Sequence, residues 1–157
     1  EAGYPNGFET PFLAYRNRDY AEAMINNLNA VGITAKFEYL KYAAFRDKVQ
    51  SGGAPFNFGT WGSYSINDVS AITSHFQSGG KDDYSKDPEV IKQLGIGDTS
   101  VDANVRKAAY KAALSRISGE AFMFPLWSYN TWYAFSKDVD FNPTPDEIPR
   151  FFTAKWM

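Results

Sequence analysis

The segment from Phe58 to Asp68 carries the residues best suited to chemistry. A short apolar stretch ends at Gly59, and after Gly62 the chain presents hydroxyls, an amide and a carboxylate. In open α/β sheets, ligands bind beyond the carboxyl ends of strands, where glycine lets a ligand approach the backbone. The same pattern also fits a strand that ends in an aromatic-packed loop. The candidate ligand-binding residues are Trp61, Gly62, Ser63, Tyr64, Ser65, Asn67 and Asp68.

Histidine and cysteine chemistry is limited by composition. The chain has no cysteine and a single histidine, His75, so zinc cages built from cysteine or several histidines are excluded. A Ser-His-Asp arrangement would need this one histidine, and its neighbours Thr73, Ser74 and Phe76 match no nucleophile elbow. We expect His75 to be structural or solvated.

Acidic residues imitate two kinds of site. Residues 138–142 resemble the first ligands of a calcium loop, but Pro143 and Pro149 occupy the places that require Gly and Glu. The pairs Asp82–Asp83 and Asp146–Glu147 could act in glycoside hydrolysis, yet they lie in Gly- or Pro-rich segments that we expect to be solvated. We therefore predict no catalytic residue and no metal ligand.

Length and charge narrow the class of protein. The 157 residues suit one domain, residues 1–157, and no apolar run approaches the ~20 residues of a membrane span. A net charge of −2 provides no basic field for nucleic acid. The glycines at 95 and 97 lack the third glycine and the preceding strand of a dinucleotide fingerprint. We expect a soluble domain that binds neither nucleic acid nor nucleotides.

Hydrophobic periodicity predicts alternating strands and helices in the first sixty residues. Asp19 and Glu22 have capping-box spacing, and Gly32 can end the helix that they begin. We expect strands at 8–15, 33–39 and 55–60, with helices at 19–32 and 42–49 between them. Such alternation favours an α/β fold with a mixed, largely parallel sheet and flanking helices.

The rest of the chain has weaker patterns. Residues 62–98 are rich in Gly, Ser and Asp and predict loops with two short helical pieces. An apolar stripe predicts a longer helix that starts near Asp102. Residues 122–135 are rich in aromatic side chains and favour one or two strands around Pro125, followed by an irregular tail.

Four stretches together resemble one known family. They are residues 1–8, residues 28–33, Gly59–Trp61 with Asp68, and residues 105–110 ahead of 121–126. In order and spacing they are similar to the C-terminal region of the extracellular solute-binding family that serves oligopeptide and dipeptide ABC importers. The resemblance implies one lobe of a periplasmic-binding-protein type II-like fold.

The resemblance also implies a context for the chain. Members are two-lobed, non-enzymatic carriers in the periplasm or anchored as lipoproteins, use no cofactor, and hand cargo to a membrane permease of an ABC transporter. On this basis the chain is the later part of the second lobe, and residues 127–157 pack on the other lobe. The implied cargo is a peptide or a similar small polar solute.

The ligand-binding positions depart from the family pattern at one place. In peptide-binding members, an aspartate three residues after the strand-end Trp pairs with the amino terminus of the ligand. This chain has Tyr64 there, and a phenol cannot neutralise an ammonium. Arg16 resembles the position where dipeptide binders place a carboxylate-pairing arginine. A carbohydrate-binding member of the same family, a hydrolase that uses a carboxylate pair and a protein-interaction module remain alternatives.

Overall fold

The computed structural model describes residues 3–62, 66–144 and 148–157. The chain divides into two compact units, which we call unit 1 (residues 1–60) and unit 2 (residues 61–157). Each unit contains its own buried hydrophobic clusters. Within the described ranges, no helix is both long enough and apolar enough to cross a membrane.

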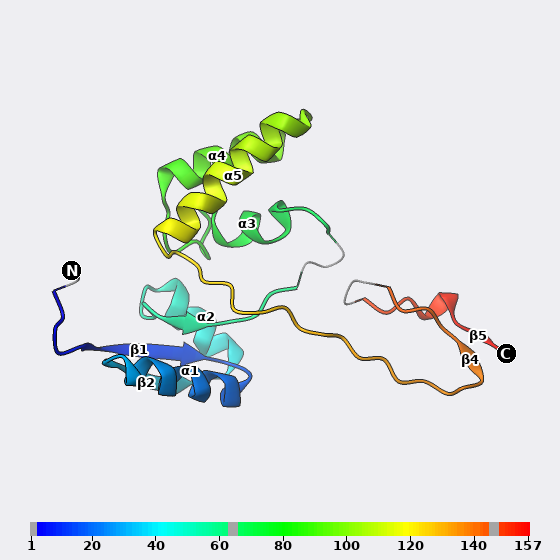
Figure 1. Cartoon of the computed structure of the whole chain (residues 1–157), viewed down its shortest axis with the longest axis horizontal. Coiled ribbons are helices and arrows are strands. Elements are labelled where there is room, and N and C mark those ends of the chain that lie inside the picture. Colours follow the sequence, from blue (N-terminus) through cyan, green and yellow to red (C-terminus); the bar gives the residue numbers. More distant parts are fainter. Residues whose placement is uncertain (1–2, 63–65, 145–147) are drawn as a thin grey trace. The chain divides into compact units, whose positions relative to one another are not determined.

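Unit 1 is a parallel sheet with helical crossovers. Its three strands have the order β2-β1-β3, and both pairings are parallel. The register places Phe8 opposite Ile33 and Leu13 opposite Asn57. The predicted order of strands and helices is confirmed (Figure 1), with bounds β1 (Phe8–Ala14), α1 (Arg18–Ala30), β2 (Ile33–Tyr39), α2 (Tyr42–Gln50) and β3 (Asn57–Phe58).

The end of the central strand β1, from Phe12 to Ala14, is buried on both faces because a helix covers each of them. Phe12 and Ala14 pack with Ala21 of α1, whereas Leu13 packs with Phe45 and other residues of the α2 side. Alternate residues of a strand point to opposite faces, so the residues on both faces of this part of β1 must be apolar. This explains the nearly continuous apolar run at the end of β1.

The start of α1 differs from the prediction. The helix begins at Arg18, and its N-cap residue Asn17 has φ 50° and makes no side-chain capping bond. Glu22 does not form a capping box with Asp19, because its carboxylate pairs with Arg18 at 2.7 Å on the helix surface. The predicted capping pair is therefore wrong, although the helix is present.

Unit 2 begins with three helices, α3 (Ser70–Phe76), α4 (Pro88–Thr99) and α5 (Ala103–Gly119). The predicted long helix near Asp102 is confirmed as α5, whereas α4 is longer than the short piece expected there. Val90 and Leu94 of α4 pack against Tyr110 and Ile117 of α5. This interface buries apolar side chains from both helices and forms the core of unit 2.

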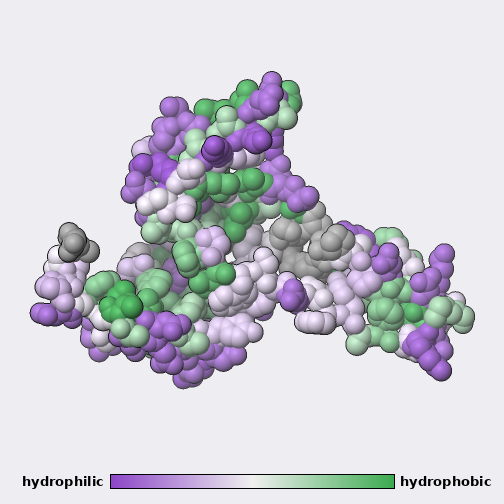
Figure 2. Space-filling view, in the orientation of Figure 1, coloured by the Kyte–Doolittle hydropathy of each residue, from purple (hydrophilic) through white to green (hydrophobic). Residues whose placement is uncertain are grey.

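The C-terminal arm, residues 122–157, differs from the prediction. Residues 122–135 contain no strand; the short antiparallel strands β4 (Val139–Asp140) and β5 (Lys155–Trp156) follow instead, with the 3-10 helix η1 (Phe151–Thr153) before β5. Aromatic residues favour strands because their side chains pack well on a pleated sheet whose strands are paired. In the described chain, no strand lies beside residues 122–135 to pair with them. Figure 2 shows hydrophobic residues at the surface where β4 and β5 lie, and Trp132, Phe152 and Trp156 are largely exposed.

Asp87 joins the start of α4 to α5. Its Oδ1 accepts hydrogen bonds from the N–H groups of Glu89 and Val90 and from Arg116 Nε, while Oδ2 accepts from Arg116 Nη2 at 2.7 Å. The Arg116 guanidinium, helped by the Val90 N–H, lowers the pKa of Asp87 from 3.8 to about 2. The charged form of this carboxylate is therefore favoured in the folded state.

Asp87→Asn is expected to lower the free energy of unfolding at neutral pH, because asparagine can still cap α4 but removes the charge that Arg116 faces. A folded pKa of about 2 against 3.8 for the unfolded chain makes this contribution complete above about pH 4 and lost as pH falls towards 2. Urea unfolding of both proteins across this range measures the difference.

Asp102→Asn provides the matched control. Asp102 caps α5 through the N–H groups of Asn104 and Val105 and has no cationic partner among the described residues. Its substitution should cost less at neutral pH. An Asp87→Asn difference from wild type that stays constant between pH 7 and about pH 2 would contradict the assignment.

Candidate functional site

Polar side chains from two strands of unit 1 meet at the carboxyl edge of its sheet. Arg16 lies shortly after the end of β1 and Thr60 shortly after the end of β3, and because these strands are parallel their ends share one edge. Arg16 Nη1 donates a hydrogen bond to Thr60 Oγ1 at 3.0 Å. The Tyr15 hydroxyl lies 3.4 Å from the same oxygen. This edge is where open parallel sheets bind ligands.

The ring of Tyr15 is held in place by α2. Its centroid lies 5.0 Å from that of Tyr42 and 4.8 Å from that of Phe45, while the Arg16 guanidinium lies 5.9 Å from the Tyr15 ring centroid. Of this cluster, only Arg16 was predicted from the sequence. Tyr15 and Thr60 were missed, although their positions at the ends of predicted strands were the available signal. A guanidinium beside two hydroxyls suits a carboxylate or another polar oxygen group.

Trp61, the first residue of unit 2, lies along α3. Its Nε1 donates to the carbonyl of Ala71 at 3.1 Å. Its ring stacks on His75 with centroids 4.0 Å apart and planes 19° apart, and meets Phe76 edge to face at 5.2 Å. Trp61 nevertheless keeps 38% of its surface exposed. The indole is therefore ordered by α3 and still accessible.

Asp68, predicted as a ligand contact, is bonded within unit 2. It accepts the Ser70 N–H at 3.0 Å near the start of α3 and pairs with Arg106 of α5. The Tyr110 hydroxyl lies 3.4 Å away and donates to Asp98 at 2.7 Å. The Ser70 hydrogen bonds, and then Arg106, hold the pKa of Asp68 below its usual value. A ligand ammonium would have to compete with Arg106 for this carboxylate.

The predicted site residues form two groups. Arg16 belongs to unit 1, whereas Trp61, Gly62, Asn67 and Asp68 belong to unit 2. Trp61 and Asp68 both contact α3, through Ala71 and Ser70 respectively, and Asn67 is exposed. The remaining predicted positions, Ser63, Tyr64 and Ser65, lie outside the described residues.

The expectation that Asp82 and Asp83 are solvated is wrong. Asp82 is 4% and Asp83 1% exposed. Asp83 accepts the N–H groups of Gly79, Ser85 and Lys86 and the Ser85 hydroxyl, and Asp82 Oδ2 lies 3.1 Å from His75 Nε2. A carboxylate can be buried when hydrogen bonds replace its hydration, which explains why these two side chains are not solvated. Asp146 and Glu147 lie outside the described residues.

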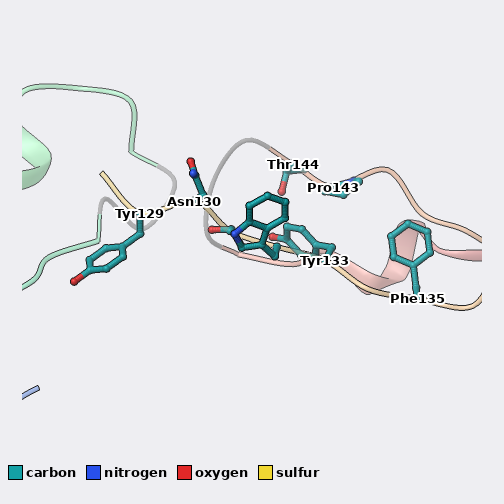
Figure 3. Close-up of a pocket in the computed structure, with 8 residues that line it drawn as sticks. Tyr129, Asn130, Tyr133, Phe135, Pro143 and Thr144 are labelled. Carbon is teal, nitrogen blue, oxygen red and sulfur yellow. The ribbon is translucent and has the colours of Figure 1, made fainter. Parts of the chain in front are cut away.

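An open hollow of about 560 Å³ lies on the C-terminal arm (Figure 3). None of the predicted site residues that the structure describes lines it. The Tyr133 hydroxyl is buried and has no hydrogen-bond partner within the described part of the chain. The lining residues come from two segments of the arm and are Tyr129, Asn130, Thr131, Trp132, Tyr133, Phe135, Pro143 and Thr144.

Comparison with protein-family models finds no match, and comparison with curated proteins finds none either. Solved structures do match. A dipeptide-binding protein from Pseudoalteromonas sp. SM9913, in complex with Met-Leu, matches 99% of this chain with a TM-score of 0.78 and 22% identity. The likeness establishes the fold. The prediction of a periplasmic-binding-protein type II-like α/β fold is confirmed.

Two further solved structures match a shorter part of the chain. The periplasmic binding protein DppA from Helicobacter pylori, in complex with the peptide STSA, covers 77% of it with a TM-score of 0.66 and 24% identity. NikA from Brucella suis, in complex with Fe(III)-EDTA, covers 73% with a TM-score of 0.60 and 22% identity. The chain spans 34% of the length of the Pseudoalteromonas protein and 25% of each of the other two.

Proposed function

We propose that this chain forms part of the second lobe of a solute-binding protein that delivers a peptide or similar small polar solute to an ABC importer. The observation that carries the proposal is the convergence of Arg16, Thr60 and Tyr15 at the carboxyl edge of a parallel sheet whose fold matches dipeptide-binding proteins. The role is binding without catalysis, in the periplasm or outside the cell, with a lipid anchor as one form of attachment. A membrane permease is the proposed partner.

The charges of the candidate residues, taken one by one, favour cargo that carries a carboxylate. Arg16 offers a planar, permanently charged donor group, whereas Asp68 is already paired with Arg106 and Tyr64 replaces the aspartate that the family resemblance leads one to expect. The ligands named for the three matching structures described above, Met-Leu, STSA and Fe(III)-EDTA, all contain carboxylate groups. A free amine is therefore the less important recognition element in this proposal.

We also propose a structural role for residues 127–157 in the larger protein. Trp127, Tyr129 and Trp132 expose between 46% and 88% of their surface, which is costly for aromatic side chains in water. Packing of this part of the arm on the other lobe would bury them. As part of the same proposal, residues 1–157 act as a single domain of the larger protein.

The hydrolase alternative gains no support from the described acidic pair, because Asp82 and Asp83 are buried and hydrogen-bonded. The carbohydrate alternative would use Trp61 as a stacking surface. The experiment below separates it from peptide binding.

Calorimetric titration of the two-lobed protein tests the proposal, with Met-Leu, its C-terminal amide and maltotriose as ligands. We expect Met-Leu to bind and the amide, which lacks the carboxylate, to bind more weakly. Arg16→Ala should weaken Met-Leu binding by roughly 10- to 100-fold, the effect of losing a charge-assisted hydrogen bond.

Lys36→Ala is the matched control, because it removes the same charge from a residue that pairs with Glu9 on the exposed sheet surface. It should leave Met-Leu affinity unchanged. Binding of maltotriose in place of Met-Leu would assign the carbohydrate alternative. Hydrolysis of Met-Leu by the purified protein would overturn the carrier proposal.

A further inference from the structure

Three residues of one short helix contact the indole of Trp61. Its Nε1 donates to Ala71 O, one ring face stacks on the His75 imidazole, and Phe76 contacts it edge to face. Ala71, His75 and Phe76 all belong to α3 (Ser70–Phe76). Among these contacts, the stacked His75 ring covers one face of the indole.

The His75 ring is itself fixed by the loop that follows α3. Its Nε2 lies 3.1 Å from Asp82 Oδ2, and its centroid lies 4.6 Å from that of Phe76 with planes 84° apart. An imidazole that lies within bonding distance of a carboxylate and contacts two aromatic rings has little freedom to rotate. Asp82 acts as the anchor of this ring.

The loop is built in a way that holds Asp82 in place. Next to it, Asp83 accepts the N–H groups of Gly79, Ser85 and Lys86 and so closes the loop around a buried carboxylate. Ser85 Oγ donates to Asp83 and also lies 3.2 Å from Gln77 Oε1, at the end of α3. The contacts run from Asp83 through the loop to Asp82, then to His75 and to Trp61.

We propose that His75 and Asp82 are positioning residues that hold the Trp61 indole as a preformed contact surface for the ligand. A tryptophan that is already ordered does not lose rotamer freedom when a ligand binds, and this preorganisation increases affinity. With one face covered by His75, the ligand contacts the part of the 38% exposed surface that remains. The ligand role of Trp61 rests on the proposed function; its positioning by His75 does not.

Fluorine NMR of the 157-residue chain labelled with 5-fluorotryptophan tests the positioning. Trp61→Phe assigns the Trp61 signal among those of the four tryptophans. His75→Ala should shift and broaden the Trp61 signal and leave the signals of Trp127, Trp132 and Trp156 unchanged. Ser74→Ala, on the same helix but exposed, should change none of them. An unchanged Trp61 signal in a folded His75→Ala variant would overturn the proposal.

Two substitutions of Asp82 keep the test decisive if His75→Ala fails to fold. Asp82→Ala removes the anchor without altering α3 and should shift the Trp61 signal. Asp82→Asn retains an oxygen acceptor for His75 and should restore the wild-type signal. If Asp82 had a merely structural role, asparagine would not be expected to preserve the wild-type signal. Equal Trp61 signals in Asp82→Ala and wild type would overturn the proposal.

Ligand affinity then separates positioning from the proposed function. In the two-lobed protein, Asp82→Ala should weaken Met-Leu binding by about three- to tenfold, the effect of ordering one side chain. Unchanged affinity, despite a shifted Trp61 signal, would overturn the ligand-contact role of Trp61. A wild-type protein that binds no ligand would instead overturn the proposed function, and the NMR result would still decide the positioning.

Discussion

Gly7→Ala is expected to destabilise unit 1 by about 2 to 4 kcal/mol, the sum of a left-handed backbone cost and an overpacking cost. Gly7 has φ 77°, and a Cβ on it would lie 1.8 Å from the carbonyl oxygen of Gly32. That oxygen accepts the Phe8 N–H at 3.1 Å. Relief of the clash would separate the start of β1 from β2, where Phe8 pairs with Ile33. Urea unfolding followed by circular dichroism measures the loss.

Gly52→Ala separates the two costs. Gly52 has φ 79°, but apart from its two chain neighbours no described residue has an atom within 4 Å of a Cβ built there. Its substitution should cost about 1 kcal/mol, the backbone contribution alone. Equal losses for Gly7→Ala and Gly52→Ala would mean that the close approach of Gly7 to Gly32 does not exist in solution.

Gly97→Ala is expected to destabilise unit 2 by about 1 to 2 kcal/mol, because overpacking of up to about 3 kcal/mol exceeds the helix-propensity gain of about 1 kcal/mol. A Cβ on this buried glycine of α4 would lie 2.6 Å from Cε1 and 2.8 Å from Cδ1 of Tyr110. The ring cannot easily retreat, since its hydroxyl donates to Asp98 at 2.7 Å. Thermal and urea unfolding measure the loss.

Gly95→Ala is the control on the same helix. Apart from its chain neighbours and the nearby backbone of α4, no described atom lies within 4 Å of the position that its Cβ would occupy, so alanine should stabilise the chain by up to about 1 kcal/mol. The two substitutions are thus expected to have opposite signs. A stabilising Gly97→Ala would show that Tyr110 moves freely.

Tyr110 also links this packing to the candidate site. Burial, and then the hydrogen bond to Asp98, raises the pKa of Tyr110 to about 12, and its hydroxyl lies 3.4 Å from Asp68. A displaced Tyr110 ring would therefore move the hydroxyl group that contacts the Asp68 carboxylate, which is paired with Arg106. We therefore expect a substitution that loosens the packing of α4 on α5 also to affect the position of the loop before α3.

Local patterns were sufficient for unit 1 and for α5. The period-two run at 33–39 and the apolar stripe of α5 reflect which face of each element is buried. This information is contained in the spacing of residues that are close together in the sequence. The same reasoning failed for 122–135. There the composition favours strands, but a strand needs a partner, and the short pairing of β4 with β5 lies elsewhere.

The sequence by itself determined the α/β class, the order of elements in unit 1 and the placement of Arg16 at a strand end. Only the tertiary structure decided how charges are compensated. Asp68 meets Arg106 across 38 positions and Asp87 meets Arg116 across 29, while Asp82 is buried against His75. The reason is physical: a carboxylate is a free ligand contact or a bonded structural group according to neighbours that helix packing brings close, and local sequence does not contain those distances.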